Sequence, residues 1–185
     1  MTDEVLIKQF LSGYERAFDK LIRRWQEPIY NFCLRYLGAD DSAKDVLQMT
    51  FMRVYQKLST LEDYSKFTTW IYQISKNLCF DELKKKKYDY LSDIEHENKT
   101  KTESLMTEEP NPSQISEQKE LVQVLKSAVQ SLPEDQRLII ILKTYHELKF
   151  REIAEIIKIP VSTVKARMYN GLKALRPILN KWQIK

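Results

Sequence analysis

Apolar residues recur at intervals of three and four along most of this 185-residue chain, and this spacing constrains its fold more than any other feature. Residues at that interval line one face of an α-helix, whereas a half-buried strand needs strict alternation. No segment sustains such alternation, and only three glycines are present. The sequence therefore predicts an all-α protein.

Composition divides the chain into two helical parts. Residues 89–115 are rich in Glu, Ser, Thr, Asn and Lys, include two prolines and show no sustained periodicity. This composition is typical of a flexible linker, because such a segment cannot bury enough apolar surface to fold. We expect two small helical domains, formed by residues 1–88 and 116–185, joined by this linker.

Three segments of the N-terminal part predict the core of a helical bundle, since their apolar residues step by three and four. The expected core residues are Phe18, Leu21, Trp25, Ile29, Phe32, Tyr36, Ala43, Val46, Leu47, Phe51, Val54, Leu58, Phe67, Trp70, Ile71, Ile74, Leu78 and Leu83.

The stretch from Ser131 to Arg176 has the pattern of a helix-turn-helix. Pro133 and the two acids after it suit the first turn of a helix, where the backbone dipole is positive. Two helical apolar stripes then flank a short break around Pro160. The stripes are Phe150, Ile153, Ala154 and Ile157 before the break, and Val164, Met168, Leu172, Leu175 and Leu179 after it.

With that stripe turned inward, the last helix presents small and polar side chains flanked by cations. Small polar groups can read base edges, while long cations fix the helix on phosphates. An ordinary amphipathic helix with a solvated side is the alternative, which the preceding short helix and tight turn disfavour. The candidate duplex contacts are Arg151, Ser162, Thr163, Lys165, Ala166, Arg167, Tyr169, Asn170 and Lys173.

Charge supports a nucleic-acid partner once it is resolved along the chain. Residues 119–185 hold 13 lysines and arginines against 6 acids, whereas the remainder holds 17 against 20. The positive charge is concentrated in the C-terminal part, as expected for a DNA-binding domain.

A second candidate surface interleaves aromatics, hydroxyls, amides and lysines between Tyr64 and Lys84. Aromatic rings can stack on unpaired bases, amides can bond their edges and lysines can follow the backbone, so single-stranded DNA is the expected ligand. The lysine run beginning at Lys84 could equally be a solvated helix end. The candidates are Tyr64, Lys66, Thr68, Thr69, Tyr72, Gln73, Lys76, Asn77 and Lys84.

Catalysis, cofactor binding and metal binding find no support in the sequence. The chain has no glycine-rich phosphate loop and no metal-ligand spacing, and we expect both histidines, His96 and His146, to be solvated. Cys33 and Cys79 lie within helical patterns and are expected to be buried thiols in a reducing cytoplasm. No signal peptide or membrane span is evident, so a cytoplasmic protein without membrane insertion is expected.

Three motifs in order resemble the sigma-70 family of bacterial transcription initiation factors, specifically the extracytoplasmic-function (ECF) group. The first motif is Asp45-Val46-Leu47-Gln48-Met49-Thr50-Phe51, which resembles region 2.2 of the family. The second is Phe67-Thr68-Thr69-Trp70-Ile71-Tyr72-Gln73-Ile74 with Asn77, which resembles region 2.3. The third runs from Leu132-Pro133 through Glu152-Ile153-Ala154 to Thr163-Val164-Lys165-Ala166-Arg167, which resembles region 4. The passage from region 2 through a linker directly to region 4 is typical of the ECF group.

The resemblance implies a non-enzymatic polymerase subunit that recognises and melts promoters. It implies that Asp45, Gln48 and Phe51 contact core RNA polymerase, that the first domain opens the minus-ten element, and that the second reads the minus-thirty-five element. An anti-sigma factor is a further implied partner. Because Trp70 falls on the apolar stripe, we expect it to hold the preceding loop rather than to stack on DNA.

Three positions depart from the family pattern. Lys158 stands where the turn usually has glycine, Lys149 stands where a serine often caps the helix, and Ala166 replaces a common serine on the outward face. A helix-turn-helix regulator that is not a polymerase subunit is the alternative function. Such a regulator should carry a receiver or ligand-binding domain with strands. The N-terminal sequence has a helical pattern and indicates no such domain.

Overall fold

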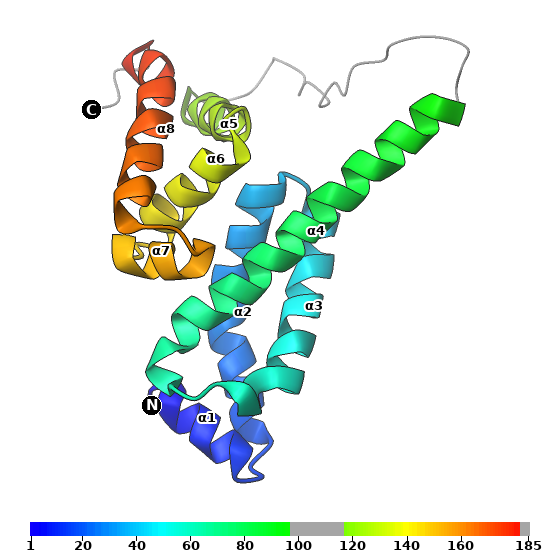
Figure 1. The fold of residues 1–185 in the computed structure, drawn as a ribbon, viewed down its shortest axis with the longest axis vertical. Coiled ribbons are helices and arrows are strands. Elements are labelled where there is room, and N and C mark those ends of the chain that lie inside the picture. The colour runs from blue at the N-terminus through cyan, green and yellow to red at the C-terminus, as the bar shows by residue number, and fades with distance from the viewer. Residues whose placement is uncertain (97–116, 182–185) are drawn as a thin grey trace.

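The computed structural model describes residues 1–96 and 117–181, with side chains for 1–90 and 122–180, and the regular structure of these residues is entirely helical (Figure 1). The prediction of an all-α protein is confirmed. The helices in chain order are α1 (Asp3–Leu11), α2 (Arg16–Leu37), α3 (Asp40–Lys57), η1 (Leu58–Thr60), η2 (Tyr64–Lys66), α4 (Phe67–His96), α5 (Glu117–Gln130), α6 (Glu134–Ile140), η3 (Ile141–Tyr145), α7 (Phe150–Ile157) and α8 (Val161–Lys181).

The N-terminal domain is a bundle in which α2, α3 and α4 pack on one another and α1 packs against α2 (Figure 1). Its predicted core is confirmed, since each of the eighteen expected residues is buried or packs against the buried cluster. The residues that are only partly buried are Leu47, Phe51, Trp70, Ile74 and Leu83. The helix α2 continues through Pro28, which removes one backbone donor without ending it.

Aromatic rings fix α4 against α2 inside this bundle. The Trp25 ring packs against Phe67 and Tyr72 at centroid distances of 5.7 and 6.0 Å, in both cases nearly edge to face. The Phe32 ring packs against Tyr72 at 5.5 Å. Such ring pairs favour one relative placement of two helices, so α4 is held in a defined orientation along the bundle.

The C-terminal domain places α8 across α6 and α7 (Figure 1). One part of the predicted apolar stripe is wrong: Leu172 is 42% exposed, and Gly171 occupies the inward position instead. A Cβ atom at Gly171 would lie 2.7 Å from Cδ1 of Ile140, so any side chain there would force the Ile140 side chain to move. The stripe therefore shifts by one residue where α8 meets Ile140 of α6.

The turn between α7 and α8 is built on Lys158, which adopts the left-handed conformation with φ 58°. Lysine accepts this conformation at a cost that glycine avoids. At the other end of α7, Lys149 offers no side-chain acceptor, but the Glu152 carboxylate accepts from the Lys149 N–H at 2.6 Å. The expected loss of a cap is thus partly offset by a reciprocal bond from Glu152.

The two domains contact each other. Helix α7 packs on α4, while α5 and η3 pack on α2 (Figure 1). Helix α4 extends past the boundary expected at residue 88 and reaches His96, so the helix includes the first part of the predicted linker. Residues 97–116, the rest of that linker, lie outside the described residues.

Both cysteines are free and buried, as predicted. Over the ranges 1–96 and 117–181, each helix is too short or too polar to cross a membrane.

Candidate nucleic-acid interface and apolar groove

The outward face of α8 carries the predicted duplex contacts. Tyr169 is 73% exposed, and the small and polar positions around it are also exposed or half-buried. Exposed candidates on α7 and α8 are Arg151, Ser162, Lys165, Ala166, Tyr169, Asn170 and Lys173, and half-buried ones are Thr163 and Arg167. The structure therefore brings this set together on one accessible surface.

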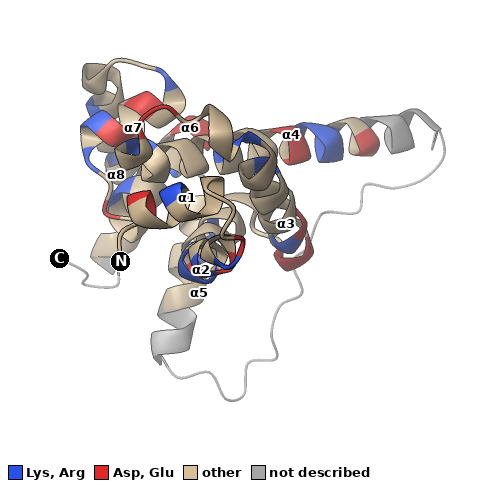
Figure 2. Ribbon diagram, turned by 90° about the horizontal axis from the view of Figure 1, so that it is seen from below, with Lys and Arg blue, Asp and Glu red and all other residues tan. Residues whose placement is uncertain are grey.

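Two cations of this surface already have partners within the domain. The Nε atom of Arg167 lies 3.1 Å from Oδ2 of Asp135, at the start of α6. The ammonium of Lys165 lies 5.8 Å from the centroid of the Phe150 ring. Both side chains are thus held on the α8 face, where they can reach phosphates. Figure 2 shows basic residues on α8 and along α4.

The loop that leads into α4 is organised by Asp63. Its Oδ1 accepts hydrogen bonds from the Ser65 N–H at 3.0 Å and from the Ser65 hydroxyl at 2.6 Å. These bonds stabilise the carboxylate and hold the pKa of Asp63 below its usual range. Trp70 packs against the core beside Phe67, at a centroid distance of 6.0 Å, so it lies on the apolar stripe as predicted.

The predicted single-strand contacts on η2 and α4 divide into exposed and covered residues. The exposed candidates are Lys66, Asn77 and Lys84, the half-buried ones are Tyr64, Thr68, Thr69, Gln73 and Lys76, and the buried one is Tyr72. The Tyr72 hydroxyl lies 2.8 Å from Nδ1 of His146, and burial raises the pKa of Tyr72 well above its ordinary value. In this arrangement the Tyr72 ring belongs to the core rather than to an accessible surface.

The expectation that His146 is solvated is wrong. Its ring packs against Phe32 and Tyr72, and its Nε2 atom is buried without a hydrogen-bond partner. Burial, with a smaller contribution from the positive charge of Arg35, lowers the pKa of His146 to about 4. Sequence patterns did not reveal this, because the contact joins the two domains. The side chain of His96 lies outside the described side chains.

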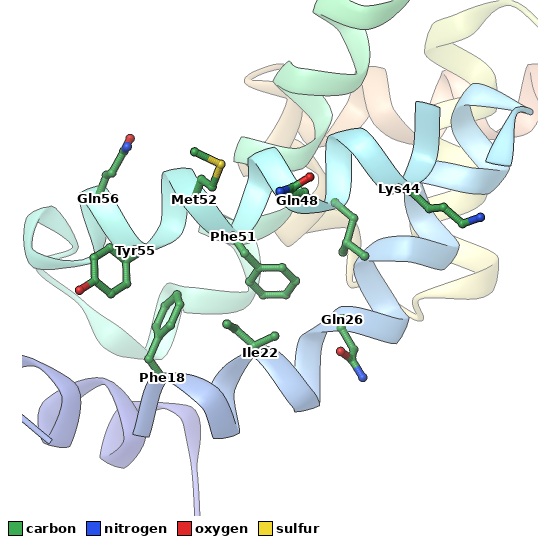
Figure 3. A pocket seen from close by; sticks show the side chains of 10 residues that line it. Phe18, Ile22, Gln26, Lys44, Gln48, Phe51, Met52, Tyr55 and Gln56 are labelled. Atoms are coloured by element: carbon green, nitrogen blue, oxygen red, sulfur yellow. The ribbon is translucent and has the colours of Figure 1, made fainter. Parts of the chain in front are cut away.

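An apolar groove of about 530 Å³ runs between α2 and α3 (Figure 3). Gln48 and Phe51 line it, whereas Asp45 is exposed on the same helix without lining it. Met52 and Tyr55 also line the groove while remaining 55% and 53% exposed. Sequence reasoning missed this pair. The available signal was that two apolar side chains lie outside the inward stripe of their helix. An exposed apolar groove of this kind is typical of a protein-binding surface.

Among the residues with described positions, no cluster of three or more histidine, cysteine or acidic side chains could hold a metal ion.

Comparisons with known proteins agree along the chain. The family model "Sigma-70 region 2" matches residues 21–88, and "Sigma-70, region 4" matches residues 123–175. The ECF RNA polymerase sigma factor SigW of Bacillus subtilis is 36% identical over 173 residues, which cover 92% of each chain. The ECF RNA polymerase sigma-E factor of Escherichia coli K12 is 31% identical over 179 residues, which cover 95% of this chain and 93% of that protein.

Two solved structures share the fold. The sigma factor RpoE of Bartonella quintana, in complex with the anti-sigma factor NepR, superposes with a TM-score of 0.69 at 21% identity, covering 88% of this chain and 96% of that one. CnrH, in complex with the cytosolic domain of CnrY, gives 0.69 at 20% identity and covers 97% of each chain.

Proposed function

Because the chain belongs to the ECF sigma factors of the sigma-70 family, which direct RNA polymerase to promoters, we propose how its own residues divide that task. The α2–α3 groove docks on the polymerase clamp, the outward face of α8 reads the minus-thirty-five element, and the η2–α4 surface holds the melted minus-ten strand. The polymerase supplies the chemistry, since a sigma factor is a non-enzymatic subunit.

The exposed apolar groove carries this proposal. A helix-turn-helix regulator needs only its DNA-reading face, whereas a polymerase subunit also needs a surface for a large protein. The rings of Phe51 and Tyr55 and the thioether of Met52 line an open groove rather than a closed core. Gln48 adds an amide beside the apolar floor, so docking there combines apolar contact with a hydrogen bond that fixes register.

The α8 surface supports duplex recognition through two kinds of side chain. Lys165 and Arg167 lie beside the apolar core of the domain and reach outward as phosphate contacts. Asn170 and Lys173 are exposed on this face and offer groups that pair with base edges. Ala166 has no hydroxyl, so at this position base contact is limited to its methyl group.

The η2–α4 surface supports strand capture because its loop is ordered before DNA arrives. Hydrogen bonds from Ser65 to Asp63 shape the loop, and Trp70 packs against the bundle one turn into the helix that follows it. Asn77 is exposed on α4, and its amide carries both a donor and an acceptor for a base edge.

An anti-sigma factor is the proposed restraining partner, and the cytoplasm is the proposed location. The sigma factors of the two similar solved structures are bound to NepR, an anti-sigma factor, and to the cytosolic domain of CnrY. Purifying the chain from its native host together with its bound proteins identifies that partner.

Size-exclusion chromatography with core RNA polymerase tests the proposal directly. The chain is expected to co-elute with the core enzyme, and the resulting complex should start transcripts at defined sites on fragmented host DNA. A regulator outside the polymerase would bind DNA yet elute separately from the core enzyme, and that result would overturn the proposal.

A further inference from the structure

One face of α4 packs against α7 and the loop that precedes it (Figure 1). Near the middle of this contact the Tyr72 hydroxyl lies 2.8 Å from Nδ1 of His146. Near its edge the ammonium of Lys66 lies 3.6 Å from Oε2 of Glu155 on α7. These contacts join residues of the two domains that are 74 or more positions apart in sequence.

A second set of contacts joins α2 to α5, α6 and η3, and on α6 the guanidinium of Arg137 lies 5.3 Å from the centroid of the Tyr36 ring. The Gln130 side chain donates its amide N–H to the Arg35 carbonyl, while its Oε1 accepts from Arg137 at 2.6 Å. The guanidinium of Arg35 lies 4.4 Å from the centroid of the Tyr145 ring. Polar groups that are paired in a partly buried interface specify one arrangement of the two surfaces. The two domains therefore meet through a specific interface.

This interface covers the α4 surface proposed to hold single-stranded DNA. Tyr72 is buried beneath His146, Lys66 is engaged by Glu155, and Lys76 is half-buried close to Lys158. On the same helix Asn77 and Lys84 are less covered. Contact of a DNA strand with both Lys66 and Lys76 thus requires that α7 and the turn after it leave them.

We propose that the face carrying Lys66, the Tyr72 hydroxyl and Lys76 is a docking surface for the C-terminal domain of the same chain, and that single-stranded DNA competes with that domain for Lys66 and Lys76. The competition rests on the proposed role of α4 in strand capture. The docking rests only on the contacts between the two domains.

Charge makes this docking reversible. Burial lowers the pKa of Lys76, and the positive charge of Lys158 on the turn after α7 lowers it further. The charge of Lys158 opposes that of Lys76 across the interface, Asp81 offsets part of this repulsion, and the exposed Lys66–Glu155 pair offsets little of the rest. DNA phosphates would neutralise both Lys66 and Lys76, so a strand replaces an unfavourable contact with a favourable one.

The groove for polymerase stays open while the strand surface is covered. The groove is lined from α2 and α3, by residues such as Ile22 and Met52, whereas the docked domain contacts α4 and the later part of α2 that carries Arg35. The docked chain can therefore meet polymerase before its two domains separate.

Fluorescence energy transfer in the full-length chain tests the docking. Dyes on cysteines introduced at the exposed positions Asp41 and Ala174 report on the two domains, and the native thiols are buried. The double variant His146→Ala/Glu155→Gln removes the polar contacts to Tyr72 on α4 and Lys66 on η2, and Glu147→Gln is a control with the same charge change. Energy transfer is expected to fall in the double variant and to persist in the control.

Binding of a fluorescein-labelled, mixed-sequence single-stranded 20-mer to the same proteins tests the competition. If the docked state is populated at about 90%, freeing the surface raises affinity about tenfold. Circular dichroism checks folding. The milder variant Tyr145→Ala, which removes an exposed ring from Arg35, should shift both readouts in the same direction by a smaller amount.

Each outcome decides one part of the proposal. Docking is overturned if energy transfer is low in the parent, or if neither the double variant nor Tyr145→Ala reduces it. Reduced transfer without a gain in strand affinity overturns competition and leaves docking in place. Adding Asn77→Ala to the opened variant tests the strand-binding role itself, because unchanged affinity there counts against the proposed function and not against the docking.

Discussion

At the scale of single residues, Lys158 shows how a departure from the family pattern is accommodated. The turn between α7 and α8 needs a left-handed residue, and Lys158 supplies it with φ 58° and ψ 45°. A residue with a Cβ atom in this conformation costs roughly 1–2 kcal/mol, partly offset by the greater entropy that glycine loses on folding. The chain therefore carries a local strain that one substitution can remove.

Lys158→Gly should raise the stability of the protein by roughly 0.5–1 kcal/mol, because it relieves that strain. Lys158→Ala is the matched control, since it removes the same charge beside Lys76 but keeps the left-handed strain. Scanning calorimetry of the full chain should give the glycine variant the higher melting temperature of the two. Equal melting temperatures would show that the gain comes from charge rather than from backbone conformation.

Asn77 is the second residue whose role can be isolated. It is exposed on α4, so Asn77→Ala should leave folding, polymerase binding and closed-complex formation near normal. Loss of its two amide functions should reduce open complex, with relief on a template already mismatched over the start region. Permanganate footprinting measures this, and Asn77→Gln, which keeps the amide, should retain part of the activity. An alanine variant that opens duplex promoters as well as the parent removes Asn77 from the mechanism.

At the scale of elements, α3 presents one face to the core and another to a partner. Asp45 and Gln48 are exposed and contribute little to the core, so replacing both with alanine should leave the melting temperature nearly unchanged. The double replacement should cost about 1.4 kcal/mol of binding free energy, which weakens polymerase binding about tenfold. Fluorescence titration with core polymerase measures this effect. Arg53→Ala, on the same helix but outside the groove, is the control that should bind normally.

The face of α8 should separate affinity from sequence preference. Lys165→Ala and Arg167→Ala should weaken binding to all duplexes and reduce the salt slope by about one for each phosphate that is no longer neutralised. The Arg167 effect should be the smaller, because Asp135 already neutralises part of its charge. Asn170→Ala and Lys173→Ala should instead change the ranking of promoter sequences. Lys126→Ala on α5 is the control for a general decrease in positive charge.

Local patterns allowed most elements to be predicted, because helical spacing, breakers and caps act within a few residues of sequence. The core of α2 is one example, and the inward position of Val164 on α8 is another. Gly171 could not be foreseen as an inward residue, since the reason is a close approach to Ile140 on another helix. The exposure of Leu172 follows from the same tertiary contact.

At the scale of the whole molecule, the sequence specified two domains but not the contact between them. The burial of Tyr72 and His146 depends on residues 74 positions apart, and no helical period links them. Gln130 and Arg35 are similarly distant in sequence and meet only when the domains pack. The candidate DNA surface of α4 could thus be proposed from the sequence, whereas the packing of the C-terminal domain on it could not.

The docked domains should separate as the pH falls, because His146 is held neutral in the interface between them. The charged or titratable groups that face His146 are Tyr72 from α4 and Arg35 from α2. In the docked chain the pKa of His146 is about 4, against 6.5 for an ordinary histidine. Protonation therefore favours separation: docking is fully stable above about pH 6.5 and loses stability as the pH falls toward about 4, by roughly 3 kcal/mol at most.

At pH 5.5 the equilibrium between docked and separated domains should shift about tenfold toward separation, relative to pH 7.5. Energy transfer between dyes on the two domains measures the shift in a tag-free chain, in which His96 is the only other histidine. His96→Gln should keep the pH response. His146→Gln should have equal transfer at pH 5.5 and pH 7.5, because glutamine does not titrate. A response that survives in His146→Gln would assign the pH dependence to another group.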